Sequence, residues 1–122
     1  PGFSNGGDST QLTYDIEPGQ YVVSTIEGRV QTDFVQNVVI TDEVPEGLVF
    51  VNSPTYNTTA DAALGRSDLQ CSTDGITFNT ATCAGAGVTH VRVVYDETTA
   101  VPVRTQYNVN EILTLQFVAR VP

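Results

Sequence analysis

The sequence contains no lysine, and all five of its cationic residues are arginines. The absence of lysine excludes Schiff-base chemistry, a phosphate-binding lysine and any lysine-based covalent cross-link between strands or subunits. Against the five arginines stand 14 acidic residues, so the chain has a net charge of −9. Because a basic face is lacking, the sequence predicts neither nucleic-acid binding nor attachment to an anionic membrane surface.

Methionine is also absent, which predicts that the sequence is a processed mature form or an excised piece. No apolar run reaches the ~18 residues of a membrane-spanning helix, so no membrane insertion is expected. What remains is a chain of 122 residues, 40% of them hydrophobic. That length suits one domain with its own apolar core.

Short segments in which apolar and polar residues alternate dominate the sequence, and this period of two is typical of half-buried strands. The expected strands are 12–16, 21–30, 34–41, 48–51, 69–72, 76–80, 88–95 and 111–121. The only helical pattern is 59–65, where Thr59 would cap a single turn that Gly65 ends. The sequence therefore predicts an all-β fold, an antiparallel two-sheet β-sandwich of seven or more strands over residues 10–122. Residues 1–9 are turn and linker formers and predict a flexible lead segment.

Two of these strands have the clearest division between an apolar and a polar face. In 88–95 the apolar face is expected to hold Val91, Val93 and Tyr95, with His90 and Arg92 opposite. In 111–121 the apolar face is expected to hold Leu113, Leu115, Phe117 and Ala119.

Cys71 and Cys83 enclose eleven residues, a spacing unlike the CxxC of redox and zinc sites. We expect a structural disulfide formed in an oxidising compartment, with a pair of free cytosolic thiols as the alternative. In the chain-entropy model, closing this loop stabilises the fold by about 3 kcal/mol. Between the cysteines, Asp74-Gly75 favours a type I′ hairpin turn.

Residues 35–51 resemble a known family. Their apolar strand is followed by Thr41-Asp42, then by Pro45-x-Gly47-Leu48, and then by an aromatic strand. This run is similar to the signature of the conserved-repeat domain of prokaryotic surface proteins, also known as domain of unknown function eleven. Residues 17–21 and 113–121 are similar to two other strand regions of that family. The resemblance implies an immunoglobulin-like sandwich, an extracellular or cell-surface location and a structural or adhesive role, with no catalytic residues.

Few residues suggest chemistry. His90 would need a nucleophile and an orienting acid to act as a catalytic base, and a solvent-facing strand histidine is the simpler interpretation. Oxygen ligands for calcium are plentiful, but no Asp-x-Asp-x-Asp-Gly loop is present, so we expect no metal and no cofactor. Asn57-Thr58-Thr59 is a glycosylation sequon in a turn-rich stretch, which makes Asn57 a candidate glycan acceptor. The sequence does not predict an enzyme.

Residues 10–16 form an amphipathic strand whose apolar face carries Leu12, Tyr14 and Ile16. This strand could complete its own sandwich, or it could insert into a neighbouring subunit by β-strand addition. Head-to-tail exchange does not close, so it produces a filament. We therefore expect a secreted structural subunit of an extracellular or cell-surface fibre, whose partners are copies of itself. The alternative is a stand-alone module of a larger surface adhesin that binds a glycan or a protein.

Overall fold

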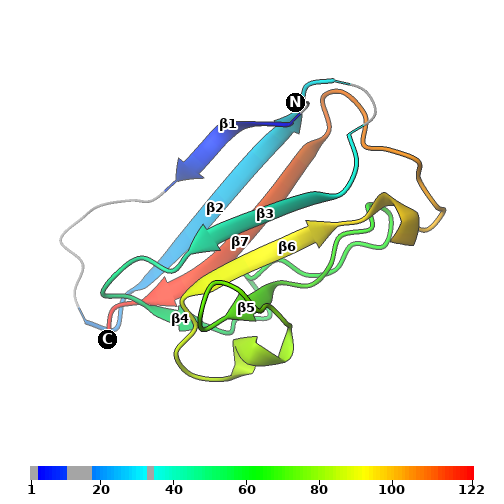
Figure 1. Cartoon of the computed structure of the whole chain (residues 1–122). Coiled ribbons are helices and arrows are strands. Elements are labelled where there is room, and N and C mark those ends of the chain that lie inside the picture. Colours follow the sequence, from blue (N-terminus) through cyan, green and yellow to red (C-terminus); the bar gives the residue numbers. More distant parts are fainter. Residues whose placement is uncertain (1–2, 11–17, 33–34) are drawn as a thin grey trace.

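A computed structural model describes residues 3–10, 18–32 and 35–122 of the chain. It is all-β, with strands in two antiparallel sheets packed face to face (Figure 1). The strands are β1 (Phe3–Thr10), β2 (Tyr21–Val30), β3 (Val38–Glu43), β4 (Val49–Val51), β5 (Gln70–Ser72), β6 (His90–Tyr95) and β7 (Ile112–Arg120). One sheet has the order β1-β2-β7-β4 and the other β3-β6-β5. Two short 3-10 helices, Ala81–Ala84 and Glu97–Thr99, lie in the connections.

The core lies between the sheets and is built from the apolar faces that alternation predicts. Val91, Val93 and Tyr95 of β6 are fully buried, whereas His90 and Arg92 on the other face are not. All four residues expected on the inner face of β7 are also fully buried, namely Leu113, Leu115, Phe117 and Ala119. Both predictions are confirmed. The pattern arises because the side chains of a strand point alternately to its two faces.

Strand β1 corrects the prediction of a flexible lead over residues 1–9. Phe3–Thr10 pairs with β2 at the edge of the four-stranded sheet, from Phe3 opposite Val30 to Thr10 opposite Thr25. The register shifts between Ser4 and Asp8, around a segment with two glycines. Edge strands tolerate such glycines and bulges because ladder hydrogen bonds come from the backbone, so a composition typical of linkers does not exclude a strand.

The segment 59–65 does not form the expected helical turn. Asp61 and Arg66 instead exchange two backbone hydrogen bonds of 3.0 Å, which close a tight reversal of the chain. Gly65 has φ +68°, and a Cβ there would lie 2.0 Å from the carbonyl oxygen of Asp96. A single turn is too short to gain much helical stability, and the close approach of two backbone segments at Gly65 favours the reversal.

The predicted type I′ turn at Asp74-Gly75 is also wrong. Gly75 has φ +77°, but among the described residues other than glycine only Asn37 and Asn110 have a positive φ. Asp74 instead accepts hydrogen bonds at Oδ1 from the backbone N–H groups of Ile76 (2.8 Å) and Thr77 (3.0 Å). An aspartate that binds the backbone ahead of it stabilises a turn without entering the left-handed region.

Candidate functional site

Strand addition requires a sheet edge whose backbone groups have no partner, so the sheet edges are the candidate site. The predicted donor residues Leu12, Tyr14 and Ile16 lie outside the described residues. Thr10, the first residue of the predicted donor segment, ends β1 and pairs with Thr25.

β7 pairs with β2 along one edge and with the short β4 along part of the other edge. Beyond β4, side chains take the place of a strand partner along this second edge. Tyr95 Oη accepts a hydrogen bond from the Thr114 N–H (2.8 Å) and donates one to the Thr114 carbonyl (3.0 Å). Two residues further along β7, the Gln116 N–H donates to Thr58 Oγ1 (2.7 Å), and the Thr58 N–H donates to the Gln116 carbonyl (2.9 Å). These contacts leave no room for an added strand beside Thr114 and Gln116.

Asn57 extends this cover along β7 and joins it to β4. Its Oδ1 accepts from the Val118 N–H (3.1 Å), and its Nδ2 donates to the Val51 carbonyl (3.0 Å). The side chain is only 8% exposed. Asn57, the candidate glycan acceptor, is therefore buried with its amide bonded at both ends, so a glycan on Nδ2 would require the amide to leave this position and both hydrogen bonds to break. Nothing in the sequon itself distinguishes a buried amide from an exposed one.

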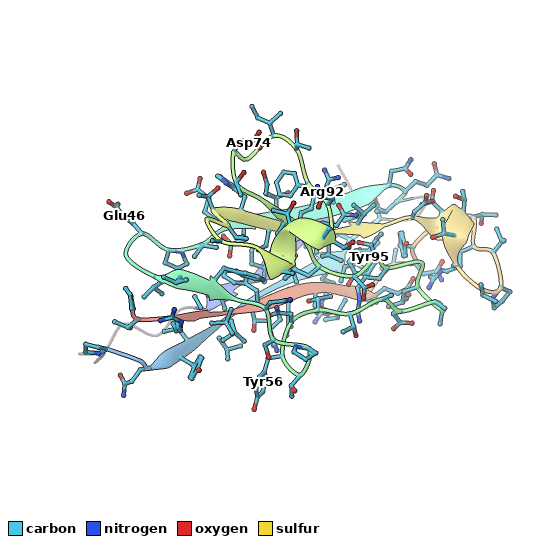
Figure 2. The ribbon with its side chains drawn as sticks, turned by 90° about the horizontal axis from the view of Figure 1, so that it is seen from below. Glu46, Tyr56, Asp74, Arg92 and Tyr95 are labelled. Atoms are coloured by element: carbon cyan, nitrogen blue, oxygen red, sulfur yellow. A yellow bond between two sulfur atoms is a disulfide. The ribbon has the colours of Figure 1, made fainter. Side chains whose placement is uncertain are left out.

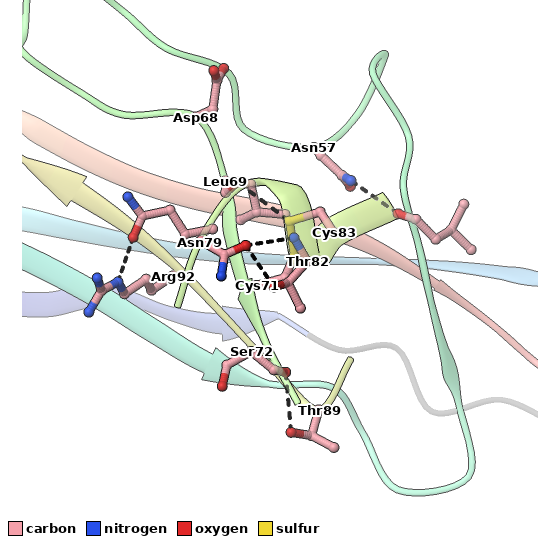
Figure 3. The surroundings of a disulfide bond; sticks show 12 residues. Asn57, Asp68, Leu69, Cys71, Ser72, Asn79, Thr82, Cys83, Thr89 and Arg92 are labelled. Carbon is pink, nitrogen blue, oxygen red and sulfur yellow. Dashed lines mark hydrogen bonds between the residues drawn. A yellow bond between two sulfur atoms is a disulfide. The ribbon is translucent and has the colours of Figure 1, made fainter. Parts of the chain in front are cut away.

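The edge of β5 that faces away from β6 is covered by the segment between Cys71 and Cys83, which we call the hairpin (Figure 3). Cys71 and Cys83 form the predicted disulfide, with their Cα atoms 5.0 Å apart. Cys71 also exchanges backbone hydrogen bonds with Asn79 (2.9 and 3.1 Å), on the side of β5 that faces away from β6. The hairpin places Phe78 over the guanidinium of Arg92, 4.6 Å from the ring centroid, so it also covers part of the outer face of this sheet.

The edge of β3 that faces away from β6 has no neighbouring strand among the described residues. Val44, the residue after β3, donates its N–H to the carbonyl of Thr89, the residue before β6 (2.8 Å), so the backbone groups of Val44 point towards β6. Because backbone groups alternate in direction along a strand, those of Val39, Thr41 and Glu43 point to the open edge. No described residue binds the outward backbone groups of Val39 or Thr41, and the Val39 side chain is 49% exposed.

The far end of this open edge is closed by an aspartate of β3 itself. Asp42 Oδ1 accepts from the Glu43 N–H (2.8 Å), while Asp42 Oδ2 is buried without a hydrogen-bond partner in the described part of the chain. Burial raises the pKa of the Asp42 carboxyl above its ordinary value, against the lowering effect of the Glu43 N–H. The edge thus offers free backbone groups at Val39 and Thr41 and ends at a carboxylate.

His90 lies between a hydroxyl and a carboxylate, an arrangement that sequence reasoning did not anticipate. Its Nδ1 is 2.8 Å from Thr89 Oγ1, and its Nε2 is 3.4 Å from Glu43 Oε1. The contacts link the start of β6 to the end of β3, and the imidazole lies against Gly75, where a Cβ would approach it to 2.9 Å. This geometry fastens the hairpin turn onto the three-stranded sheet.

Among residues 3–10, 18–32 and 35–122, no three histidine, cysteine or carboxylate side chains gather as metal ligands would. The same residues include no helix that is long and apolar enough to cross a bilayer.

Comparison of the chain with known protein families, with curated proteins and with solved structures finds no match.

Proposed function

We propose that the protein is a secreted structural subunit of an extracellular or cell-surface fibre that assembles by β-strand addition. Residues 10–16 of one copy, with the apolar face Leu12, Tyr14 and Ile16, would pair with the open edge of β3 in the next copy. The sandwich would be immunoglobulin-like, as the resemblance of residues 35–51 implies. The four-plus-three arrangement of antiparallel strands is compatible with such a fold.

The observation that carries the proposal is the difference between β3 and the other edges. β3 pairs with β6 over Val38–Glu43 without a register shift, so it offers a regular template. By contrast, β1 is interrupted by a shift, and bulged edges resist further pairing. β7 and β5 are covered by side chains and by the hairpin, and β4 has only three residues, Val49–Val51. Regular, unpaired backbone therefore favours β3 as the acceptor.

Secretion is supported by the disulfide, because such bonds persist mainly in oxidising compartments. Filament formation is supported by the geometry of exchange. The donor and acceptor are different surfaces, so each added copy presents a new acceptor and the assembly does not close.

The experiment is electron microscopy of the full chain, with and without Val39→Pro. The Val39 N–H points away from β6, so proline removes the outward donor without removing a hydrogen bond of the β3–β6 ladder. Val39→Thr is the matched control, because it keeps the N–H and suits a strand. We expect filaments from the wild type and from Val39→Thr, and monomers from Val39→Pro.

Circular dichroism and a thermal melt must show that Val39→Pro still folds. A second variant, Leu12→Asp with Tyr14→Asp and Ile16→Asp, tests the donor and should also give monomers. A wild-type chain that remains monomeric at all concentrations would contradict the fibre and favour the adhesin module. Filaments that persist in folded Val39→Pro would contradict β3 as the acceptor.

A further inference from the structure

The carboxyl group of Asp42 lies at the open edge of β3, on the face of the strand that points into the sandwich. Asp42 continues the alternation of Val38 and Ile40, which are both buried. Its Oδ1 accepts from the Glu43 N–H (2.8 Å), and the backbone groups of Glu43 point away from β6. In Figure 2 the loop after β3 extends from the sandwich with Glu46 near its tip. The carboxyl is therefore turned towards the edge at which a strand could be added.

The second oxygen of this carboxyl has no partner. Asp42 Oδ2 is buried, and no residue in the described part of the chain donates a hydrogen bond to it. Burial raises the pKa of the carboxyl above its ordinary value, which the Glu43 N–H offsets only in part. A buried acceptor without a donor costs free energy, so a donor supplied by another molecule would be bound favourably.

The regular part of the open edge is short and ends at a carboxylate on each side. At the start of β3, Glu97 Oε2 accepts from the Asn37 N–H (3.1 Å). At the end of β3, the Asp42 carboxyl already binds the outward N–H group. Outward N–H groups without a described partner remain at Val39 and Thr41. An added antiparallel strand would form one hydrogen-bonded pair with each of these two residues.

We propose that Asp42 fixes the register of strand addition by binding the hydroxyl of Thr10 in the incoming strand, an inference that rests on the fibre proposed above. The residue opposite Asp42 would belong to a non-hydrogen-bonded pair, whose Cα atoms are about 4.5 Å apart and whose side chains lie close together. Alternation would put Thr10 on the apolar face of the donor segment, where no other residue has a hydroxyl on a short side chain. Thr10 ends β1, so the contact requires its pair with Thr25 to open.

This register matches polar with polar and apolar with apolar residues. Thr10 lies opposite Asp42 and, two residues further on, Leu12 lies opposite the buried Ile40. A slip of two residues would put Leu12 opposite Asp42, so that an apolar side chain covers Oδ2 without offering it a donor. A slip of one residue would turn the apolar face of the incoming strand away from the core. Asp42 is thus a positioning residue that distinguishes the register of Thr10 from the nearest alternatives.

Intermolecular disulfides in the full chain report the register directly, on the outer face of the strands, while Thr10 and Asp42 stay intact. In the proposed register Gln11 lies opposite Thr41, so Gln11→Cys with Thr41→Cys should give covalent multimers on a non-reducing gel. Thr13→Cys with Thr41→Cys is the matched control, because Thr13 meets Thr41 only after a slip of two residues. The Cα atoms of a hydrogen-bonded pair are about 5.5 Å apart, a separation that a disulfide can span.

Replacing either member of the proposed contact should remove this preference. In the background of Asp42→Leu, we expect the Gln11→Cys multimers to fall about tenfold relative to the Thr13→Cys multimers. Thr10→Val should have the same effect, whereas Thr10→Ser keeps the hydroxyl and should restore the wild-type ratio. A role of Asp42 in folding alone would change the amount of filament but not the ratio of the two cross-links.

The outcomes separate the register from the fibre itself. A wild type that forms no filaments would contradict the fibre and, with it, this register. Filaments in which Thr13→Cys reacts with Thr41→Cys as readily as Gln11→Cys does would overturn the register and leave strand addition standing. An unchanged ratio in both Asp42→Leu and Thr10→Val, with folding verified by circular dichroism, would show that the contact does not select the register.

Discussion

At the outward edge of β7 and at the open edge of β3, backbone N–H and C=O groups point away from the sheet and need hydrogen-bond partners. The two edges differ in whether such partners are present. Along β7, Tyr95, Thr58 and Asn57 supply hydrogen-bond partners where no strand lies alongside. Along β3, the outward groups of Val39 and Thr41 have no described partner. The difference shows that this fold suppresses strand pairing at one edge and leaves it available at another, which is how proteins manage sheet edges.

Tyr95→Phe is expected to have the largest effect on this comparison. It removes the hydroxyl that binds both the N–H and the carbonyl of Thr114 and leaves both without a protein partner. We expect the free energy of unfolding to fall by about 2–3 kcal/mol, measured by urea denaturation. Tyr56→Phe is the control, because Tyr56 is 55% exposed, and it should change stability little. Equal losses in both variants would show that the β7 edge does not depend on the Tyr95 hydroxyl.

Asn57→Ala should lower the free energy of unfolding by about 2 kcal/mol, because the Val118 N–H and the Val51 carbonyl both lose their partner. Asn52→Ala, at an exposed neighbour, is the control. Mass spectrometry of the protein gives an independent test. A glycan found on Asn57 in the folded protein would contradict the buried position of the Asn57 amide.

Thr58→Val tests the covered edge of β7 and Val39→Thr tests the open edge of β3. Both variants exchange threonine and valine, which have nearly the same shape, in opposite directions. Thr58→Val removes the acceptor of the Gln116 N–H and should cost about 1 kcal/mol. Val39→Thr alters an exposed side chain at the open edge and should stay within about 0.5 kcal/mol of wild type. Thermal melts of the two variants measure the contrast, and a larger loss at Val39 would reverse the assignment of covered and open edges.

The smallest expected effect is on the pH dependence of the hairpin that covers β5. Hydrogen bonds from the backbone N–H groups of Thr77 and Ile76, with one from Ser72, lower the pKa of Asp74 to about 2. A lowered pKa means that Asp74 stabilises the fold fully above about pH 4, and that this contribution disappears as the pH falls towards 2. At Asp42 the raised pKa has the opposite sign, so protonation there favours the folded state.

Melting temperatures between pH 5 and pH 2 test this prediction. Asp74→Asn should melt at a lower temperature than wild type at pH 5, and the gap should narrow by pH 2. For Asp42→Asn, any gain over wild type should instead be larger at pH 5 than at pH 2. Parallel pH profiles for wild type and both variants would show that neither carboxylate is linked to folding.

The inner faces of β6 and β7 could be predicted because they depend on a local pattern. The disulfide could be predicted as well, since the two cysteines lie close in the sequence and an alternative site was excluded by their spacing. Tyr107 shows the limit of such reasoning. It is fully buried and donates its hydroxyl to the Leu64 carbonyl (2.6 Å), yet it lies in no regular strand and no alternation marks it.

Alternation of apolar and polar residues by itself determined the all-β class and the side of β6 and β7 that faces the core. A period of two is a property of the extended backbone and needs no knowledge of distant partners. Only the tertiary structure decided which edges are covered. The residues that bind β7 are separated in sequence from their partners by 19 positions at Tyr95, 58 at Thr58 and 61 at Asn57. A hydrogen bond between such distant groups exists only once both sheets are in place. For this reason the sequence shows Asn57 only as part of a glycosylation sequon, whereas in the folded protein it is buried and binds two strands.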